Sequence, residues 1–238
     1  MPINLSMGEM IPTQVVLPLV SVNDKGKFSG FIGTGFFVGD ESLFVTAAHN
    51  VEAEGVQFGV IYVENLERIF PASVRYVDKL SDVAILEVVG YRPEKRLALS
   101  SGDDIYLNLP VYSLEYGTTV IRGRDVRFSP ASRIGNVIRS FSKLELLGRE
   151  LVDALEISFP ALRGASGAPV LTNDGFMVIG MLVGNMSYHL LPAQIETATD
   201  ENGQVIEEIK YMLPVAVAAH VNSIRQAIEK VLNNKKVS

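Results

Sequence analysis

Short runs of β-branched and aromatic residues, separated by turn residues, fill this sequence from Gln14 almost to its end. The runs are rich in Val, Ile, Phe and Tyr, and Gly, Asp, Asn and Pro stand between them. Many short strands at such a spacing indicate a sandwich or a barrel, whereas a parallel α/β sheet needs helices between its strands. The sequence therefore predicts an all-β protein.

A helical pattern occurs only near the end of the chain and predicts one terminal helix. Its apolar residues recur at spacings of four and three: Val217, Val221, Ile224, Ile228 and Val231. Just before this segment, Asn202-Gly203 is a favoured pair for a tight turn that needs positive φ. We therefore expect residues 186–212 to form a projecting β-hairpin.

The composition is that of an ordinary soluble globular protein. Hydrophobic residues make up 47% and charged residues 20% of the sequence. The length of 238 residues suits one large β domain or two small ones. No apolar run approaches the roughly 18 residues of a membrane-spanning helix, and the net charge of −6 argues against general nucleic-acid binding. The amino terminus lacks a secretory signal pattern, which favours the cytoplasm, although a trimmed exported chain would look the same.

Cysteine is absent, which excludes disulfides, a thiol nucleophile and a thiolate metal site. The three histidines, His49, His189 and His220, are too scattered to suggest a metal centre, and we expect no cofactor. Three arginines stand close together in one segment: Arg122, Arg124 and Arg127. Such a cluster is more often a solvated loop than an anion site.

Three short segments carry residues suited to nucleophilic catalysis. Ser166 lies in LRGASGAPVL, His49 follows an apolar strand in FVTAAHNVE, and Asp82 precedes one in KLSDVAILEV. Taken singly, each residue fits an ordinary structural role in a turn or at the end of a strand. Together they supply what a serine needs at neutral pH, because an imidazole can take its proton and a carboxylate can orient the imidazole.

The turn around the serine also predicts donors for a developing oxyanion. Gly164 and Gly167 give the backbone freedom to point the amides of Gly164 and Ser166 into one small hole, and Ala165 and Ala168 leave that hole uncrowded. Losing one such donor typically costs about 3 to 4 kcal/mol of transition-state stabilisation. This pattern favours a serine that is presented for catalysis.

In combination, the segments GTGFFV, VTAAHNV, SDVAILEV and GASGAPVL resemble successive landmarks of the chymotrypsin-like (trypsin-like) serine proteases, closest to the cysteine-free bacterial HtrA/Deg-like branch. The order His, Asp, Ser agrees with that fold. The resemblance runs from about Gln14 to Ala227 and implies two six-stranded antiparallel β-barrels with a C-terminal α-helix. The implied boundaries are 14–105 for the first barrel, 106–216 for the second and 217–233 for the helix.

By this resemblance the chain would be a serine endopeptidase that acts through an acyl-enzyme. His49 would be the general base, Asp82 its orienting partner and Ser166 the nucleophile, and the amides of Gly164 and Ser166 would form the oxyanion hole. One strand would pair with the backbone of a polypeptide substrate, and its residues are Val183, Gly184 and Asn185.

The pocket for the residue before the cut would have Pro160 and Ala161 at its base. No acid stands there to pair with Lys or Arg, which predicts cleavage after small or medium apolar residues. Val183 replaces a serine whose hydroxyl supports the buried aspartate in many relatives. Backbone amides near His49 would then have to supply more of that support.

Ala165 departs from many animal members of the family, in which an acid here pairs with a newly cut amino terminus. The chain is therefore either competent as made or has an oxyanion hole that a partner orders. Because a free protease in the cytoplasm would be hazardous, we expect control by a regulatory protein partner. The loop from Arg122 to Glu150 is the expected place where that partner acts.

Two other interpretations stay open at this point. GASGA approaches the G-x-S-x-G elbow of α/β-hydrolases, but that elbow needs a helix after the serine, whereas APVLTNDG is typical of a strand and a turn. A protease fold that serves as a binding module, with its triad intact and its oxyanion hole collapsed, is the second alternative.

Overall fold

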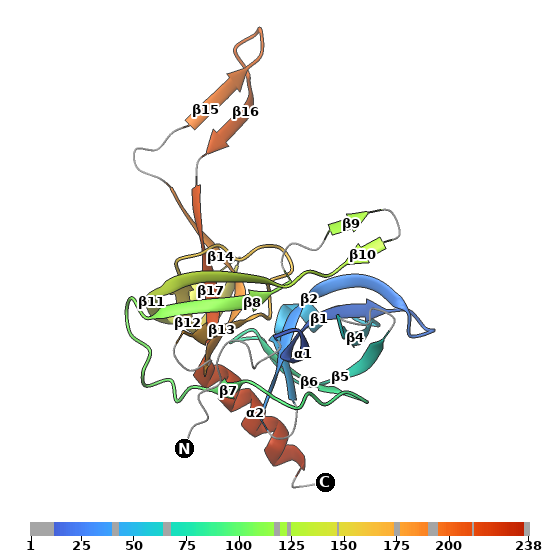
Figure 1. The fold of residues 1–238 in the computed structure, drawn as a ribbon. Coiled ribbons are helices and arrows are strands. Elements are labelled where there is room, and N and C mark those ends of the chain that lie inside the picture. The colour runs from blue at the N-terminus through green and yellow to red at the C-terminus, as the bar shows by residue number, and fades with distance from the viewer. Residues whose placement is uncertain are drawn as a thin grey trace.

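The computed structural model describes residues 12–39, 43–63, 68–116, 120–122, 125–146, 148–173, 177–189, 195–210 and 212–235. Strands dominate, and two β structures lie next to each other with one long helix at the end of the chain (Figure 1). No helix in these described ranges is long and apolar enough to cross a membrane.

The first half of the chain forms a closed barrel of six antiparallel strands in the order β1-β2-β3-β6-β5-β4. The strands are β1 (Val16–Val22), β2 (Phe28–Val38), β3 (Leu43–Ala47), β4 (Gln57–Ile61), β5 (Ile69–Asp78) and β6 (Val83–Val88). A short helix, α1 (Pro12–Val15), precedes the barrel, and a 3-10 turn, η1 (Ala48–Val51), follows β3. Phe36, Phe37 and Phe44 are fully buried and form part of its core.

The second half forms a seven-stranded sheet in the order β13-β8-β11-β12-β17-β14-β7, and β13 pairs with β14 as well. Its strands are β7 (Ala98–Leu99), β8 (Pro110–Glu115), β11 (Ala131–Leu146), β12 (Arg149–Ile157), β13 (Pro169–Thr172), β14 (Met177–His189) and β17 (Met212–His220). We expected a six-stranded barrel here, and the structure instead has a sheet of seven strands. The additional strand, β7, pairs in parallel with β14 because the segment between the halves passes along the sheet, where the Ser100 N–H bonds the Val178 carbonyl.

The projecting hairpin expected within residues 186–212 is present. It consists of β15 (Ile195–Thr199) and β16 (Val205–Lys210) and extends away from the body of the protein (Figure 1). The Asn202-Gly203 pair does not form the expected two-residue turn. Gly203 has positive φ, and the side chain of Asp200 accepts hydrogen bonds from the amides of Asn202 and Gln204, which makes the loop longer.

The terminal helix, α2 (Val221–Lys235), begins four residues later than expected. Val217 instead lies in β17, where it pairs with Glu156 and with Gly184. Spacing alone could not separate the two elements, because a buried strand runs directly into the apolar face of the helix. Arg225 of α2 donates hydrogen bonds to the carbonyls of Ser100 and Leu99, which ties the helix to the segment between the halves.

The segment from Arg122 to Glu150, expected to be a loop, is largely strand. A two-stranded sheet of β9 (Val120–Arg122) and β10 (Asp125–Arg127) precedes the long β11–β12 hairpin. Arg124 and the side chains of Arg122, Arg127 and His189 lie outside the described residues.

Candidate active site

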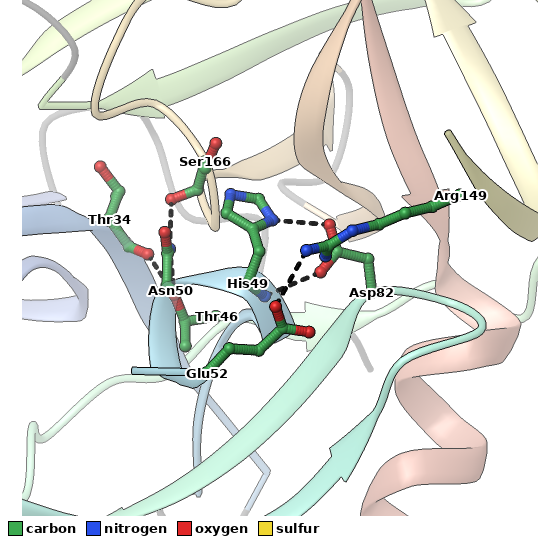
Figure 2. Close-up of polar contacts among 8 residues, drawn as sticks. All are labelled: Thr34, Thr46, His49, Asn50, Glu52, Asp82, Arg149 and Ser166. Atoms are coloured by element: carbon green, nitrogen blue, oxygen red, sulfur yellow. Dashed lines mark hydrogen bonds and ion pairs between the residues drawn. The ribbon is translucent and has the colours of Figure 1, made fainter. Parts of the chain in front are cut away.

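His49 and Asp82 meet because β3 and β6 are antiparallel and pair Ala47 with Val83. His49 follows this pair in η1, just after β3, and Asp82 directly precedes β6. The Nδ1 atom of His49 lies 2.7 Å from Oδ2 of Asp82, and the His49 backbone N–H donates to Oδ1 at 2.9 Å (Figure 2). Asp82 is only 5% exposed. The carboxylate therefore fixes both the ring and the backbone of the histidine.

The backbone around Asp82 adds support to this pair. Asp82 has a φ of 54°, a left-handed conformation that aspartate tolerates better than most residues. Its carbonyl accepts a hydrogen bond of 3.0 Å from the Ala48 N–H. The amides of Ala48 and His49 thus both bind Asp82, at a site where Val183 offers no hydroxyl.

The contact with Asp82 determines which nitrogen of His49 can act as a base. An ionised carboxylate is only an acceptor, so Nδ1 must donate to it. In the neutral ring the proton then sits on Nδ1, and Nε2 keeps a free lone pair. This is the tautomer that a general base in a serine triad requires.

Ser166 occupies a tight turn that hydrogen bonds hold on both sides. Ala165 donates to the Leu162 carbonyl at 2.9 Å, Ala168 donates to the Ala165 carbonyl at 2.9 Å, and Gly167 donates to the Leu182 carbonyl at 2.8 Å. A strand, β13, follows the turn. The helix of an α/β-hydrolase elbow is therefore not present, which excludes that alternative.

The glycines of this turn are needed for close approach as well as for conformation. Gly164 and Gly167 have φ values of +91° and +89°. A Cβ atom on Gly167 would overlap the Thr34 carbonyl oxygen, and one on Gly164 would overlap the ring of Phe31. The serine turn is thus packed directly against β2 of the first barrel.

A polar network from the first barrel holds the serine turn, and the sequence analysis missed it. The Ser166 carbonyl accepts a hydrogen bond of 3.0 Å from Nδ2 of Asn50 (Figure 2). It also accepts one of 2.9 Å from the Thr34 N–H. The Thr34 hydroxyl donates to the Gly164 carbonyl at 2.8 Å and accepts from the Tyr116 N–H at 3.2 Å. Thr46 connects Thr34 to Asn50, since its hydroxyl donates to the Thr34 carbonyl and accepts a hydrogen bond from the Asn50 side chain. The only sequence signal for these roles was that Thr34 lies in GTGFFV and that Thr46 and Asn50 lie in VTAAHNV, two segments that resemble landmarks of the family.

The amides expected to form an oxyanion hole are available. Within the described residues, neither the Gly164 nor the Ser166 N–H donates a hydrogen bond. The same ranges hold no hydrogen bond between the Ser166 hydroxyl and His49, although both residues line one cavity of about 560 Å³.

This cavity brings together most of the residues predicted to contact substrate. His49, Asp82 and Ser166 line it with Ala161, Val183, Gly184 and Asn185. Pro160 is half-buried beside Ala161 and is not one of the lining residues. Asp82 is the only acidic residue of the described lining, and no described group of three or more His, Asp or Glu residues could hold a metal ion.

The tip of the β11–β12 hairpin contributes a further wall that sequence analysis did not find. Leu146, Arg149 and Leu151 line the cavity, and Arg149 donates a hydrogen bond of 2.9 Å to the Glu52 carboxylate just beyond η1. The Val152 N–H also bonds the Leu80 carbonyl at 3.1 Å. The hairpin therefore joins the first barrel close to Asp82, a long-range contact that no local pattern signals.

Solved structures similar to this chain include proteins from M. tuberculosis and Magnetospirillum magneticum. The Rv3671c protease of M. tuberculosis in its active form has a TM-score of 0.64 and 18% identity, over 92% of this chain and 81% of that one. Its Ser343Ala mutant in the inactive form has a TM-score of 0.59 and 17% identity, over 92% and 87% of the two chains. The MamO protease domain from Magnetospirillum magneticum has a TM-score of 0.58 and 18% identity, over 90% and 95%.

Sequence comparison gives the family. No curated protein is significantly similar to the chain. The family described as trypsin-like peptidase domain matches residues 33–181, more than half of the sequence, and this stretch holds His49, Asp82 and Ser166. The chain therefore belongs to the trypsin-like peptidase domain family and has the chymotrypsin-like fold.

Proposed function

We propose that the protein is a serine endopeptidase that hydrolyses polypeptides through Ser166, His49 and Asp82. The observation that carries this proposal is the contact of 2.7 Å between His49 Nδ1 and the Asp82 carboxylate, in the cavity that Ser166 also lines. It leaves Nε2 as the only ring nitrogen that can accept a proton from a hydroxyl. The family membership agrees with a peptidase.

The proposed reaction has two halves. Nε2 of His49 removes the proton of the Ser166 hydroxyl as its oxygen bonds the substrate carbonyl carbon, and the protonated ring then gives that proton to the leaving amine. Asp82 stabilises the imidazolium between the two transfers. The amides of Gly164 and Ser166 donate to the carbonyl oxygen as it becomes an oxyanion. Water then releases the acyl group from Ser166 by the same steps.

The proposed cut follows small or medium apolar residues. Ala161, Leu162 and Val183 give the cavity an apolar lining, and the only described acid in it, Asp82, is already bonded to His49. A substrate Lys or Arg would therefore lack a counter-ion. Control by a regulatory protein and a cytoplasmic location remain predictions from the sequence.

A binding module with a protease fold is the second candidate. The missing hydrogen bond between the Ser166 hydroxyl and His49, among the described residues, favours it. This geometry also occurs in active proteases without substrate, where catalytic hydrogen bonds tighten only in the complex.

Labelling with a fluorophosphonate probe separates the two candidates, because only a serine with a working base and oxyanion hole reacts. We expect the wild type to be labelled and the Ser166→Ala and His49→Ala variants to remain unlabelled. Hydrolysis of a casein substrate should be lost in the same two variants, and the double variant should lose no more than either single one. If folded wild type resists the probe, the endopeptidase proposal fails and the binding module is favoured.

A further inference from the structure

Asn185 of β14 makes a two-way contact with the backbone of Ala161. Its Oδ1 atom accepts a hydrogen bond of 2.7 Å from the Ala161 N–H, and its Nδ2 atom donates one of 2.7 Å to the Ala161 carbonyl. An N–H must donate and a carbonyl must accept, so the partners themselves fix which end of the side-chain amide carries the oxygen. All four polar groups of this contact are satisfied.

The contact joins two segments that both line the cavity of Ser166. Ala161 lies in the segment that leads into the serine turn, whereas Asn185 belongs to β14, which also carries Val183 and Gly184. All four residues line the cavity of Ser166. The side-chain amide therefore occupies space between the segment before the nucleophile and the strand expected to hold the substrate. Because Ala161 is expected at the base of the pocket for the residue before the cut, we infer that this amide stands where that side chain would enter.

We propose that Asn185 is a specificity-determining residue that closes this pocket to all but small side chains, such as those of Gly, Ala and Ser. The inference rests on the proposed endopeptidase function and narrows its substrate class from small or medium residues to small ones. Asn185 acts by its position and takes no part in the bond-breaking steps.

A larger substrate side chain would have to displace the Asn185 amide and break its two hydrogen bonds with Ala161. Ala161 is only 9% exposed, so its N–H and carbonyl have little access to water. A Leu or Phe side chain that pushed the amide aside would offer no replacement hydrogen bonds. A buried polar group left unpaired in this way lowers kcat/KM by an order of magnitude or more.

No other side chain of similar size could form the same bridge. An aspartate would accept from the Ala161 N–H but present a second oxygen to the Ala161 carbonyl, and the two would repel each other. An alanine would leave the space empty. Asn185→Ala and Asn185→Asp therefore both break the bridge, the first by removing it and the second by repulsion with almost unchanged volume.

The test is a series of peptides that differ only in the residue before the cut, which is Ala, Val, Leu or Phe. For the wild type we expect kcat/KM with Ala to exceed that with Leu by at least about tenfold. In Asn185→Ala the Leu-to-Ala ratio should rise by at least about tenfold, and Asn185→Asp should move it in the same direction. The matched control is Asn136→Ala, whose half-buried side chain donates to the Asn108 carbonyl and is not among the described residues that line the cavity, so that its loss should leave the ratio unchanged.

Fluorophosphonate labelling keeps this test separate from that of the proposed function. If the wild type is not labelled, the endopeptidase proposal itself has failed. If it is labelled but cleaves after Leu or Phe as fast as after Ala, the role of Asn185 is overturned. An unchanged Leu-to-Ala ratio in a folded Asn185 variant overturns it equally, and should Asn185→Ala not fold, Asn185→Asp and the wild-type profile decide.

Discussion

The side-chain amide of Asn50 donates a hydrogen bond of 3.0 Å to the main-chain carbonyl of Ser166. Asn50 follows His49 in the first half of the chain, whereas Ser166 belongs to the second half. Because the Thr34 N–H bonds the same carbonyl, both lone pairs of this oxygen are used by the first barrel. The peptide that carries the candidate nucleophile is therefore oriented by residues far away in the sequence.

Thr34→Val tests how much the first barrel contributes to the serine turn. Thr34 is fully buried, and valine keeps its shape while removing the hydroxyl that bonds the Gly164 carbonyl and the Tyr116 N–H. Losing these two hydrogen bonds should lower the free energy of unfolding by about 1 to 3 kcal/mol. Hydrolysis should fall more than it does in Thr172→Val, a variant that loses one hydroxyl bond to the Met177 amide. Chemical denaturation and kcat/KM measure the two effects, and equal losses of activity in both variants would contradict the role.

Gly167→Ala should be far more damaging than Gly26→Ala. Both glycines have positive φ, so each substitution strains the backbone by about 1 kcal/mol or more. A Cβ on Gly26 meets nothing within 4 Å, whereas one on Gly167 would overlap the Thr34 carbonyl and the Thr46 hydroxyl. We expect Gly26→Ala to melt a few degrees lower with full fluorophosphonate labelling, and Gly167→Ala to lose labelling. Similar behaviour of the two variants would show that close packing at the serine turn is unimportant.

Asp82→Asn should abolish most of the turnover without disturbing the fold. Asparagine also tolerates the left-handed backbone of this position. Its oxygen would accept from the His49 N–H, so its NH2 group would face Nδ1 and move the ring proton to Nε2. In this tautomer His49 cannot act as a base, and kcat should fall by about 10⁴-fold. The exposed Asp103→Asn is the control, and the unfolding temperature of both variants should stay near that of the wild type.

His220 should make the protein less stable in acid. This residue precedes α2, and its Nδ1 atom accepts a hydrogen bond of 3.1 Å from the Asn222 N–H in the first helical turn. Burial lowers the pKa of His220, and the carboxylate of Asp153 opposes this shift. Between the lowered pKa and the ordinary value the unfolded chain binds more protons than the folded one, so stability is lost as the pH falls through this window.

Thermal unfolding of His220→Asn at pH 7.5 and pH 5 measures this dependence. Asparagine is a good capping residue and does not titrate in this range. The wild type should lose more stability than the variant between the two pH values, and His220→Ala should lose about 1 kcal/mol at pH 7.5 because the cap is absent. Parallel pH profiles for wild type and His220→Asn would rule out His220 as the group responsible.

The sequence predicted the features that local patterns encode. Alternating strand and turn residues indicated an all-β chain, and the family landmarks pointed to His49, Asp82 and Ser166, which the structure places around one cavity. The contacts that hold this site were not predictable, because Thr34, Asn50 and Arg149 each bond a partner in the other half of the chain. The start of α2 was also misplaced, since an apolar strand and an apolar helix face follow each other without a break.

The bonds from Thr34 and Asn50 to Ser166 also bear on how the molecule comes apart. They join the barrel to the sheet at Ser166, so the two halves cannot separate without breaking the bonds that orient the Ser166 peptide. The position of Ser166 and the contact between the two halves are therefore coupled. A ligand that stabilises the serine turn should also stabilise this contact. If the proposed endopeptidase function is correct, separation of the halves should abolish hydrolysis because it breaks these two bonds.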